Sequence, residues 1–145
     1  MKTVVLVLLL LVIAGAGGLF YLGQKSRSGA APGLNEGHLA SCPSAPNCVS
    51  SEINTSQDQR VIPFQANAWR QIPAVIEELG GTVTRQESEY LSAEFKSSVF
   101  KFTDDVEFRL AEDAVHVRSA SRVGYSDMGV NRARVEAIRA LLNSD

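Results

Sequence analysis

The hydrophobic pattern of the chain begins with an apolar run directly after the N-terminus. Lys2 is followed by an uncharged apolar stretch over residues 4–13, and the apolar character continues to Leu22. At about 1.5 Å per residue, a helix over residues 3–23 is roughly 31 Å long, which matches the hydrocarbon core of a bilayer. The pattern therefore predicts that residues 1–23 are a signal anchor that stays in the membrane as one transmembrane helix.

The same run permits a second interpretation, which is a signal peptide that is removed. Ala14 and Ala16 form an Ala-x-Ala cleavage site after the apolar stretch. Cleavage after Ala16 would release the domain into the periplasm, but it would leave the apolar residues 17–22 as an exposed tail. Retention is favoured for that reason. The expected location is the cell inner membrane, single-pass, with the domain in the periplasm.

A change of composition after the apolar run predicts the domain organisation. Residues 24–37 are small and polar and contain Gly and Pro, so they are predicted to be a linker. Residues 38–145 are long enough for one domain and too short for two. Their first part, residues 38–63, shows no clear period and is expected to be an irregular lead-in that packs on the domain.

Helical periodicity appears next. A helix is predicted from Asn67, as its N-cap, to Leu79, where Gly80 follows as a C-cap. Pro73 either kinks this helix or opens its regular part. The apolar positions that share one helical face are Trp69, Ile72, Val75, Ile76 and Leu79.

Alternating apolar and polar positions then predict four strands. They cover residues 82–87, 90–96, 100–110 and 114–122. The third is either one long strand or two strands separated by a bulge at Asp104 and Asp105.

A final helix is predicted after a cap at Asp127 or Asn131. Its core face consists of Val135, Ile138, Leu141 and Leu142. The fold class is therefore α+β: an N-terminal membrane helix, then a helix, a four-stranded antiparallel meander sheet and a C-terminal helix packed on one face.

The charge of the chain limits its partners. Lys and Arg number 14 and Asp and Glu number 16, which gives a net charge of −2. A general nucleic-acid binder is usually basic, so nucleic acid is not expected as a partner. The membrane, through the N-terminal helix, is the expected partner, and no cofactor is expected.

Cys42 and Cys48 lie close together in a loop rich in turn-forming residues. Downstream of an export signal, this arrangement predicts a disulfide, which would stabilise the loop by about 2 kcal/mol at most. The alternatives are free thiols or a metal site that includes His38. Zinc needs four ligands and no fourth is nearby, so no metal is assigned.

Arginine dominates the basic residues of the C-terminal part of the chain, and it binds carboxylate or phosphate with two parallel hydrogen bonds. Arg118 and Arg122 share a strand face, and Arg132 opens the last helix, whose N-terminus attracts anions. The candidate ligand-binding residues are Arg109, Arg118, Ser119, Ser121, Arg122, Tyr125, Ser126, Asp127 and Arg132. The alternative is that nearby carboxylates hold these arginines in structural salt bridges; the candidates are Asp104, Asp105, Glu107, Asp127 and Glu136.

Two functions follow from these residues. The leading prediction is a non-enzymatic, membrane-tethered domain that binds a small anionic ligand, a lipid headgroup or an envelope protein. The second is an envelope hydrolase that uses His116, Asp127 and one of the serines Ser119, Ser121 and Ser126. The sequence has no Gly-x-Ser-x-Gly elbow, so no catalytic residue is assigned.

Several blocks of the sequence resemble a known family. They are Cys42-Pro43, 46–51, Ala68-Trp69, 90–95, 104–109, 118–127 and Asn131-Arg132. In this order they resemble the bacterial and plastid family called domain of unknown function fourteen ninety-nine, over roughly residues 38–142. The resemblance implies an envelope or thylakoid-lumen setting, often with a membrane or lipoprotein anchor, and it implies no activity. The chain departs from the family in lacking a lipidation cysteine.

Overall fold

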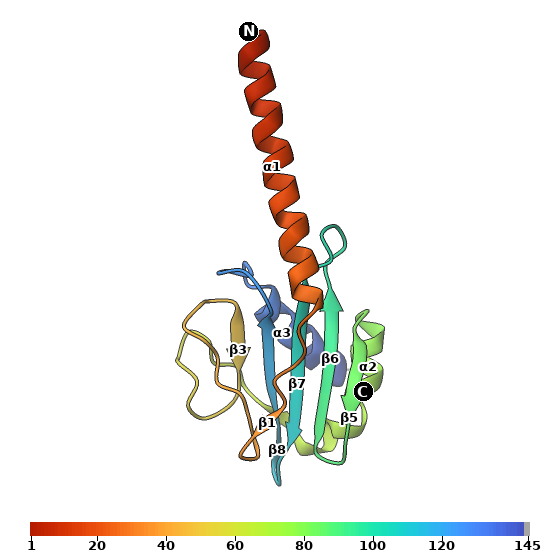
Figure 1. The fold of residues 1–145 in the computed structure, drawn as a ribbon. Helices are drawn as coiled ribbons and strands as arrows, with labels where there is room; N and C mark the ends of the chain where they lie inside the picture. Colours follow the sequence, from red (N-terminus) through yellow and green to blue (C-terminus); the bar gives the residue numbers. More distant parts are fainter. Residues whose placement is uncertain (144–145) are drawn as a thin grey trace.

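A long N-terminal helix rises from one end of an antiparallel sheet in the computed structural model, which describes residues 1–143 (Figure 1). This helix, α1 (Lys2–Arg27), continues past Gly23. By length and composition it is apolar enough to cross a membrane, and its position near the N-terminus fits a membrane anchor or a signal sequence. The two last residues of the predicted domain, 144 and 145, lie outside the described residues.

The predicted meander is present. It consists of β5 (Thr82–Gln86), β6 (Tyr90–Lys96), β7 (Thr103–Leu110) and β8 (Ala114–Ser121), each antiparallel to the next. Because side chains alternate across a strand, one face of the meander is apolar and the other carries charged and polar residues.

The prediction of a four-stranded sheet was wrong, because the sheet has six strands within residues 1–143. Both β3 (Cys48–Ser50) and β4 (Phe64–Gln65) pair with β8, and both come from or border the segment that was expected to be irregular. A separate two-stranded hairpin is formed by β1 (Leu34–Asn35) and β2 (His38–Leu39). Strands of two or three residues are too short to show a period, so the pattern could not reveal them.

The third meander strand is shorter than the predicted range of residues 100–110, which was based on apolar residues at alternate positions. Phe100 and Phe102 lie before β7, because Lys101 between them has a left-handed φ of 56° and interrupts the extended chain. The ladder is regular at Asp104 and Asp105, so no bulge occurs there. The register shift of the sheet lies instead between Val83 and Arg85 of β5.

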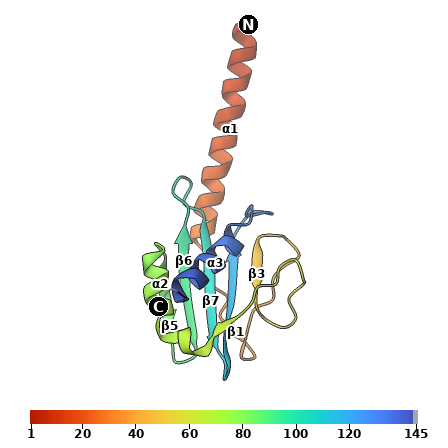
Figure 2. The same ribbon diagram turned by 180° about the vertical axis from the view of Figure 1, so that it is seen from behind.

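The two helices that were predicted within the domain pack on the apolar face of the sheet (Figure 2). The first is divided into a 3-10 turn, η1 (Ala66–Arg70), and α2 (Ile72–Glu78), so Asn67 is not its N-cap. Pro73 lies in the first turn of α2, which agrees with the alternative that it opens the regular part of the helix and does not kink it. The last helix, α3 (Val130–Leu142), buries Val135 and Ile138 completely.

The opposite face of the sheet is covered by the chain that leads out of α1. After Arg27, this segment crosses β7 and forms the β1–β2 hairpin (Figure 1). The backbone N–H of Gly33 donates to Glu107 of β7, and the N–H of Leu39 donates to Glu52. Residues 28–39, called here the covering segment, therefore fill the face on which Arg118 and Arg122 lie.

Candidate functional site

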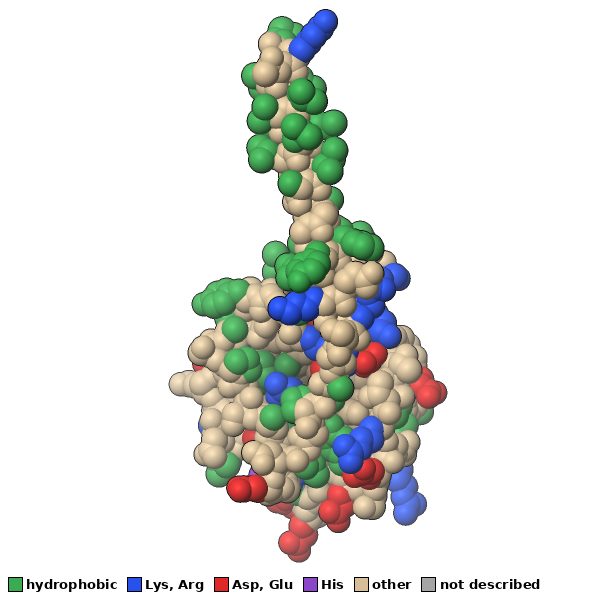
Figure 3. Space-filling model, viewed as in Figure 1, with side chains coloured by type: hydrophobic (Ala, Val, Ile, Leu, Met, Phe, Trp, Pro, Cys, Tyr) green, Lys and Arg blue, Asp and Glu red, His purple; other side chains and the backbone are tan. Residues whose placement is uncertain are grey.

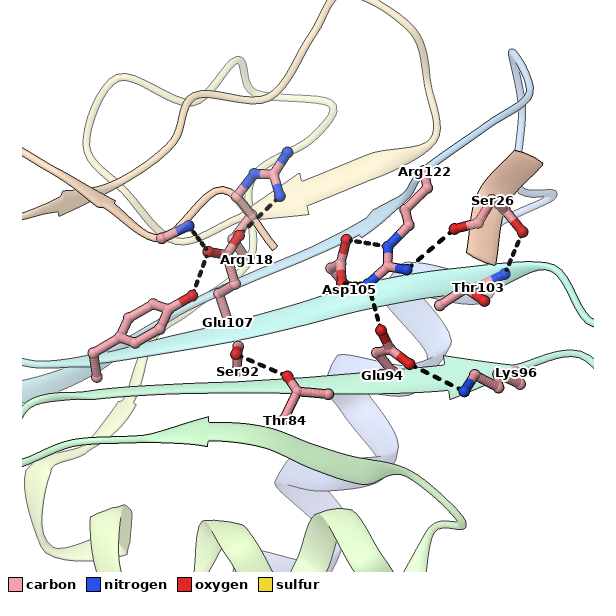
Figure 4. A network of polar contacts seen from close by, with 12 residues as sticks. Ser26, Thr84, Ser92, Glu94, Lys96, Thr103, Asp105, Glu107, Arg118 and Arg122 are labelled. Atoms are coloured by element: carbon pink, nitrogen blue, oxygen red, sulfur yellow. Dashed lines mark hydrogen bonds and ion pairs between the residues drawn. The ribbon is translucent and has the colours of Figure 1, made fainter. Parts of the chain in front are cut away.

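A fully buried carboxylate lies at the centre of the covered face. Glu107 accepts hydrogen bonds from Nη1 of Arg118 at 3.0 Å, from the hydroxyl of Tyr90 at 2.8 Å and from the N–H of Gly33 at 2.8 Å (Figure 4). Burial, and then the charge of Glu107, raise the pKa of Tyr90, so its hydroxyl stays protonated and donates. Arg118 thus has a structural counter-ion.

Arg122 joins the sheet to the end of α1. Its Nε and Nη2 donate to the two carboxylate oxygens of Asp105, at 2.8 and 2.6 Å, and Nη2 also donates to Glu94 at 2.6 Å. Its Nη1 donates to the carbonyl oxygen of Ser26 in the last turn of α1, at 3.1 Å (Figure 4). The hydrogen bond to Asp105 raises the pKa of Arg122 although burial opposes it, so the guanidinium is charged.

Two further arginines are paired in the same way. Arg109 donates from Nε and Nη2 to the two oxygens of Glu52, at 3.0 and 3.2 Å. Arg134 of α3 donates to Asp104 at 2.7 Å on the helix-covered side of the sheet. The bidentate Arg109–Glu52 pair holds both side chains in one geometry. Arg134 forms a single hydrogen bond to Asp104, and both arginines therefore connect segments of the fold.

The two predicted ligand-binding serines of β8, Ser119 and Ser121, are hydrogen-bonded to one buried side-chain amide, that of Asn131. Ser119 donates to the side-chain oxygen of Asn131 at 2.6 Å, and the side-chain nitrogen of Asn131 donates to Ser121 at 3.0 Å. Asn131 is completely buried and also donates to the carbonyl oxygen of Asn47. These contacts fix the start of α3 against β8 and β3.

The loop after β8 contains the remaining predicted residues. Tyr125 is exposed, and the hydroxyl of Ser126 accepts a hydrogen bond from the N–H of Met128. The carboxylate of Asp127 accepts from the N–H groups of Gly129 and Asn131, at 3.0 and 2.8 Å. Burial would raise the pKa of Asp127, but these backbone hydrogen bonds outweigh it and the pKa lies below its ordinary value. Asp127 therefore supports the first turn of α3, but the N-cap residue is Gly129, so the predicted cap at Asp127 or Asn131 was wrong.

The residues proposed from the sequence do not converge on one open cavity. Arg118 and Arg122 share a face, but the covering segment lies on that face and each guanidinium has a carboxylate partner. Ser119 lies on the opposite face, with α3. These contacts are those of the alternative interpretation, in which the arginines hold the fold together.

The arrangement required for a hydrolase is not assembled. His116 lies near the start of β8, where its Nδ1 is 3.3 Å from both the hydroxyl and the carbonyl oxygen of Ser51. The hydroxyl of Ser51 also accepts the N–H of Val117. Asp127 lies beyond the other end of β8 and is bonded to the start of α3. His116 and Asp127 thus have different partners and cannot act on one serine as the sequence suggested.

Arg132 is one of the predicted residues that line an open groove. The groove has a volume of about 680 Å³ and runs between the segment after β3 and the first turns of α3. Arg60 and Arg132 line it together with Ile53, Ile62 and His116. Ile53 and Ile62 are 80% and 73% exposed, so the groove has an apolar wall beside two guanidinium groups.

The two groove arginines differ from those of the sheet in their partners. Arg60 donates to the backbone carbonyls of Ile53 and Thr55, and Arg132 donates to those of Asp58 and Arg60. Within residues 1–143, neither forms a salt bridge. The two carboxylates that line the groove are engaged elsewhere, because Glu52 pairs with Arg109 and Glu136 with Arg139. Both groove arginines thus lack a carboxylate in salt-bridge contact, although the charge of Arg132 acts on the nearby exposed carboxylate of Asp58.

The predicted disulfide is present and shapes the edge of the sheet beside this region. Cys42 and Cys48 are bonded to each other, and Cys48 is the first residue of β3. The preceding Asn47 accepts from the N–H of Ser121 and donates from its side chain to Gly124. The bond therefore positions the short strand that follows it on β8.

Comparison with known proteins gives a family. The family model described as "Protein of unknown function (DUF1499)" matches residues 38–142. The chain belongs to the DUF1499 family. The comparisons with curated proteins and with solved structures gave no match. The DUF1499 match contains the sheet, the disulfide and the groove, and α1 lies outside it.

Sequence reasoning missed several residues of this DUF1499 domain. Arg60 lies in the segment without periodicity, and its only local signal was a basic residue directly before the apolar pair Val61-Ile62. Ser26 was assigned to a linker, although it is completely buried. Glu52 and Glu94 were not considered as partners of Arg109 and Arg122, because strand pairing decides which charges meet.

Proposed function

We propose that this DUF1499 protein is a single-pass membrane protein whose domain, on the periplasmic side, binds a small anionic ligand and performs no catalysis. The membrane part rests on α1, which has the length and apolarity of a transmembrane helix. The compartment rests on the disulfide, because such bonds persist in oxidising environments such as the periplasm.

The observation that carries the binding function is the pair of groove arginines. Within residues 1–143, the hydrogen-bond acceptors of these two guanidinium groups are backbone carbonyls, so both groups keep N–H donors that a ligand of the groove they line could use. Anions with planar carboxylate or phosphate oxygens match such donors. The exposed Ile53 and Ile62 add an apolar contact for the remainder of the ligand. The ligand is therefore expected to be an anion with an apolar portion.

The proposal is tested by analysis of the small molecules that accompany the full-length protein. The protein is extracted from its membrane in detergent, and mass spectrometry compares the wild type, the double variant Arg60→Gln/Arg132→Gln and the matched control Arg70→Gln. Arg70 is exposed, and it lies outside the groove. An anion should accompany the wild type and the control but not the double variant. A wild type without any anion, or a folded double variant that retains it, would overturn the proposal.

A further inference from the structure

α1 is joined tightly to one end of the sheet, so its position fixes that of the domain. The hydroxyl of the buried Ser26 accepts the N–H of Thr103, the first residue of β7, at 3.0 Å. Arg122 donates to the carbonyl oxygen of the same serine. Gly23 is buried against Phe100, and a Cβ at this position would overlap the carbonyl oxygen of Phe100. Only glycine permits this approach.

This junction sets the height of two loops relative to the membrane. Leu22 is the last apolar residue of the predicted span, and Gly23, which contacts Phe100, follows it directly. With a rise of about 1.5 Å per residue, the β6–β7 loop (residues 97–102) lies within a few Å of the hydrocarbon boundary. The β8–α3 loop (residues 122–129) lies at the same end of the sheet, on the other side of α1 (Figure 1).

Both loops expose large apolar side chains at this end. Val99 is 75% exposed, Tyr125 is 77% exposed and Met128 is 96% exposed. Lys101 and Met128 have left-handed φ values of 56° and 55°, so each loop contains a tight reversal at a residue other than glycine. Hydrophobic side chains gather around the junction of α1 and the domain in the space-filling view (Figure 3).

The charges at the two ends of the domain differ. Lys25, Arg27 and Lys101 are exposed beside the loops, whereas the one carboxylate in the loops, Asp127, is bonded to backbone N–H groups. Acidic residues gather at the opposite end of the molecule (Figure 3). Those exposed in the hairpin turns of that end are Glu36, Glu87, Glu89, Glu112 and Asp113, of which Glu87 is paired with Arg85. An anionic lipid surface attracts the first end and repels the second.

We propose that loops 97–102 and 122–129 form a membrane-resting face, which docks on the phospholipid surface of the bilayer that α1 spans. Val99, Tyr125 and Met128 enter the interfacial layer, and Lys25, Arg27 and Lys101 meet the lipid phosphates. Aromatic and long basic side chains are suited to this layer. The inference rests on the proposed retention of α1 as an anchor. It does not depend on the ligand of the groove.

Tryptophan quenching by brominated lipid tests the face. The full-length protein is placed in vesicles of phosphatidylcholine and phosphatidylglycerol. The phosphatidylcholine is unlabelled, brominated near the top of its acyl chains for the loop variants, or brominated near their ends for the variant within α1. The variants are Val99→Trp and Tyr125→Trp in the loops, Glu112→Trp at the opposite end and Val12→Trp within α1. All replace exposed residues, so the fold should persist. The native Trp69 emits in every sample. Its emission is measured with the unaltered chain and subtracted from that of each variant.

The expected result is that brominated lipid removes most of the added emission of Val99→Trp and Tyr125→Trp and none of that of Glu112→Trp. Quenching of Val12→Trp alone would show that α1 is inserted but that the loops do not touch lipid, which would overturn the membrane-resting face. Absence of quenching in Val12→Trp would instead overturn the anchor. Equal quenching of Glu112→Trp and the loop variants would contradict a defined orientation of the domain.

Discussion

Glu107 shows at the residue scale how one buried carboxylate connects three parts of the chain. It accepts from Arg118 on β8, Tyr90 on β6 and Gly33 in the covering segment. Removal of one member of a buried ion pair leaves the other charge without compensation, which is more costly than the pair itself is favourable. The same argument applies to Arg122, which the sequence offered as a ligand-binding residue.

Glu107→Gln should therefore destabilise the domain strongly. The amide cannot neutralise Arg118, and a loss of about 3 kcal/mol in the free energy of unfolding is expected. Denaturant unfolding of the full-length protein in detergent measures it. Glu112→Gln is the matched control, because Glu112 is exposed in the β7–β8 turn and forms no salt bridge within residues 1–143. Similar stability of both variants would contradict a structural role for the Glu107 network.

The pH dependence of stability should identify Glu94 as a partner of Arg122. Burial would raise the pKa of Glu94, but hydrogen bonds from Arg122 and Lys96 outweigh it and place the pKa below the ordinary 4.5. A carboxyl whose pKa is lower in the folded state stabilises above its unfolded pKa, and this contribution is lost as the pH falls through the folded pKa. The melting temperature should thus fall between about pH 5 and about pH 3.

Glu94→Gln tests this assignment, because glutamine does not titrate. The variant should melt lower than the wild type at neutral pH, and its melting temperature should change less on acidification. Glu52, whose pKa is lowered by Arg109 against the effect of burial, keeps part of the acid dependence in both proteins. Identical acid profiles for the variant and the wild type would argue against the Glu94–Arg122 pair.

Residue types could be read from the sequence, but their partners could not. The sequence predicted the disulfide and the structural alternative for the arginines. It could not decide between ligand and carboxylate, because Glu94 and Arg122 lie 28 residues apart and meet only through the register of β6, β7 and β8. Arg60 and Arg132 become neighbours only once α3 packs beside the segment after β3.

At the scale of elements, the long periodic segments were predictable and the short ones were not. β6, β7, β8 and α3 each show an apolar period over seven or more residues, whereas β5 has Val83 as its one apolar residue and was the weakest of the predicted strands. In contrast, β3 and β4 are ordered by pairing with β8 rather than by their own sequence pattern. The contact between α1 and β7 was also unpredictable, because buried serine and glycine at the end of an apolar helix resemble a linker.

Gly23→Ala tests the junction between α1 and the sheet. The added methyl group would overlap the carbonyl oxygen of Phe100, so the helix must shift away from β7. The N–H of Thr103, which donates to Ser26, should then exchange with solvent faster. Gly17→Ala is the matched control, because a Cβ at Gly17 meets nothing within 4 Å. Unchanged Thr103 exchange in Gly23→Ala would contradict the tight junction.

At the scale of the whole molecule, α1, the membrane-resting face and the acidic turns follow one another along the long axis of the protein. α1 ends on the sheet, the membrane-resting face surrounds that end, and the exposed acidic turns lie at the other end (Figure 1). A domain held in this way presents its groove at a constant height and orientation. The anchor is therefore the central claim, because without it the orientation has no physical cause.

The mass of the mature protein tests this claim most directly. Protein extracted from the membrane of its native host is analysed by intact mass and by sequencing of its N-terminal peptide. We expect residues 1–16 to remain part of the mature chain, and we expect the chain to stay in the membrane fraction after salt and alkaline washing. A mature chain that begins at Gly17 would contradict the retained anchor.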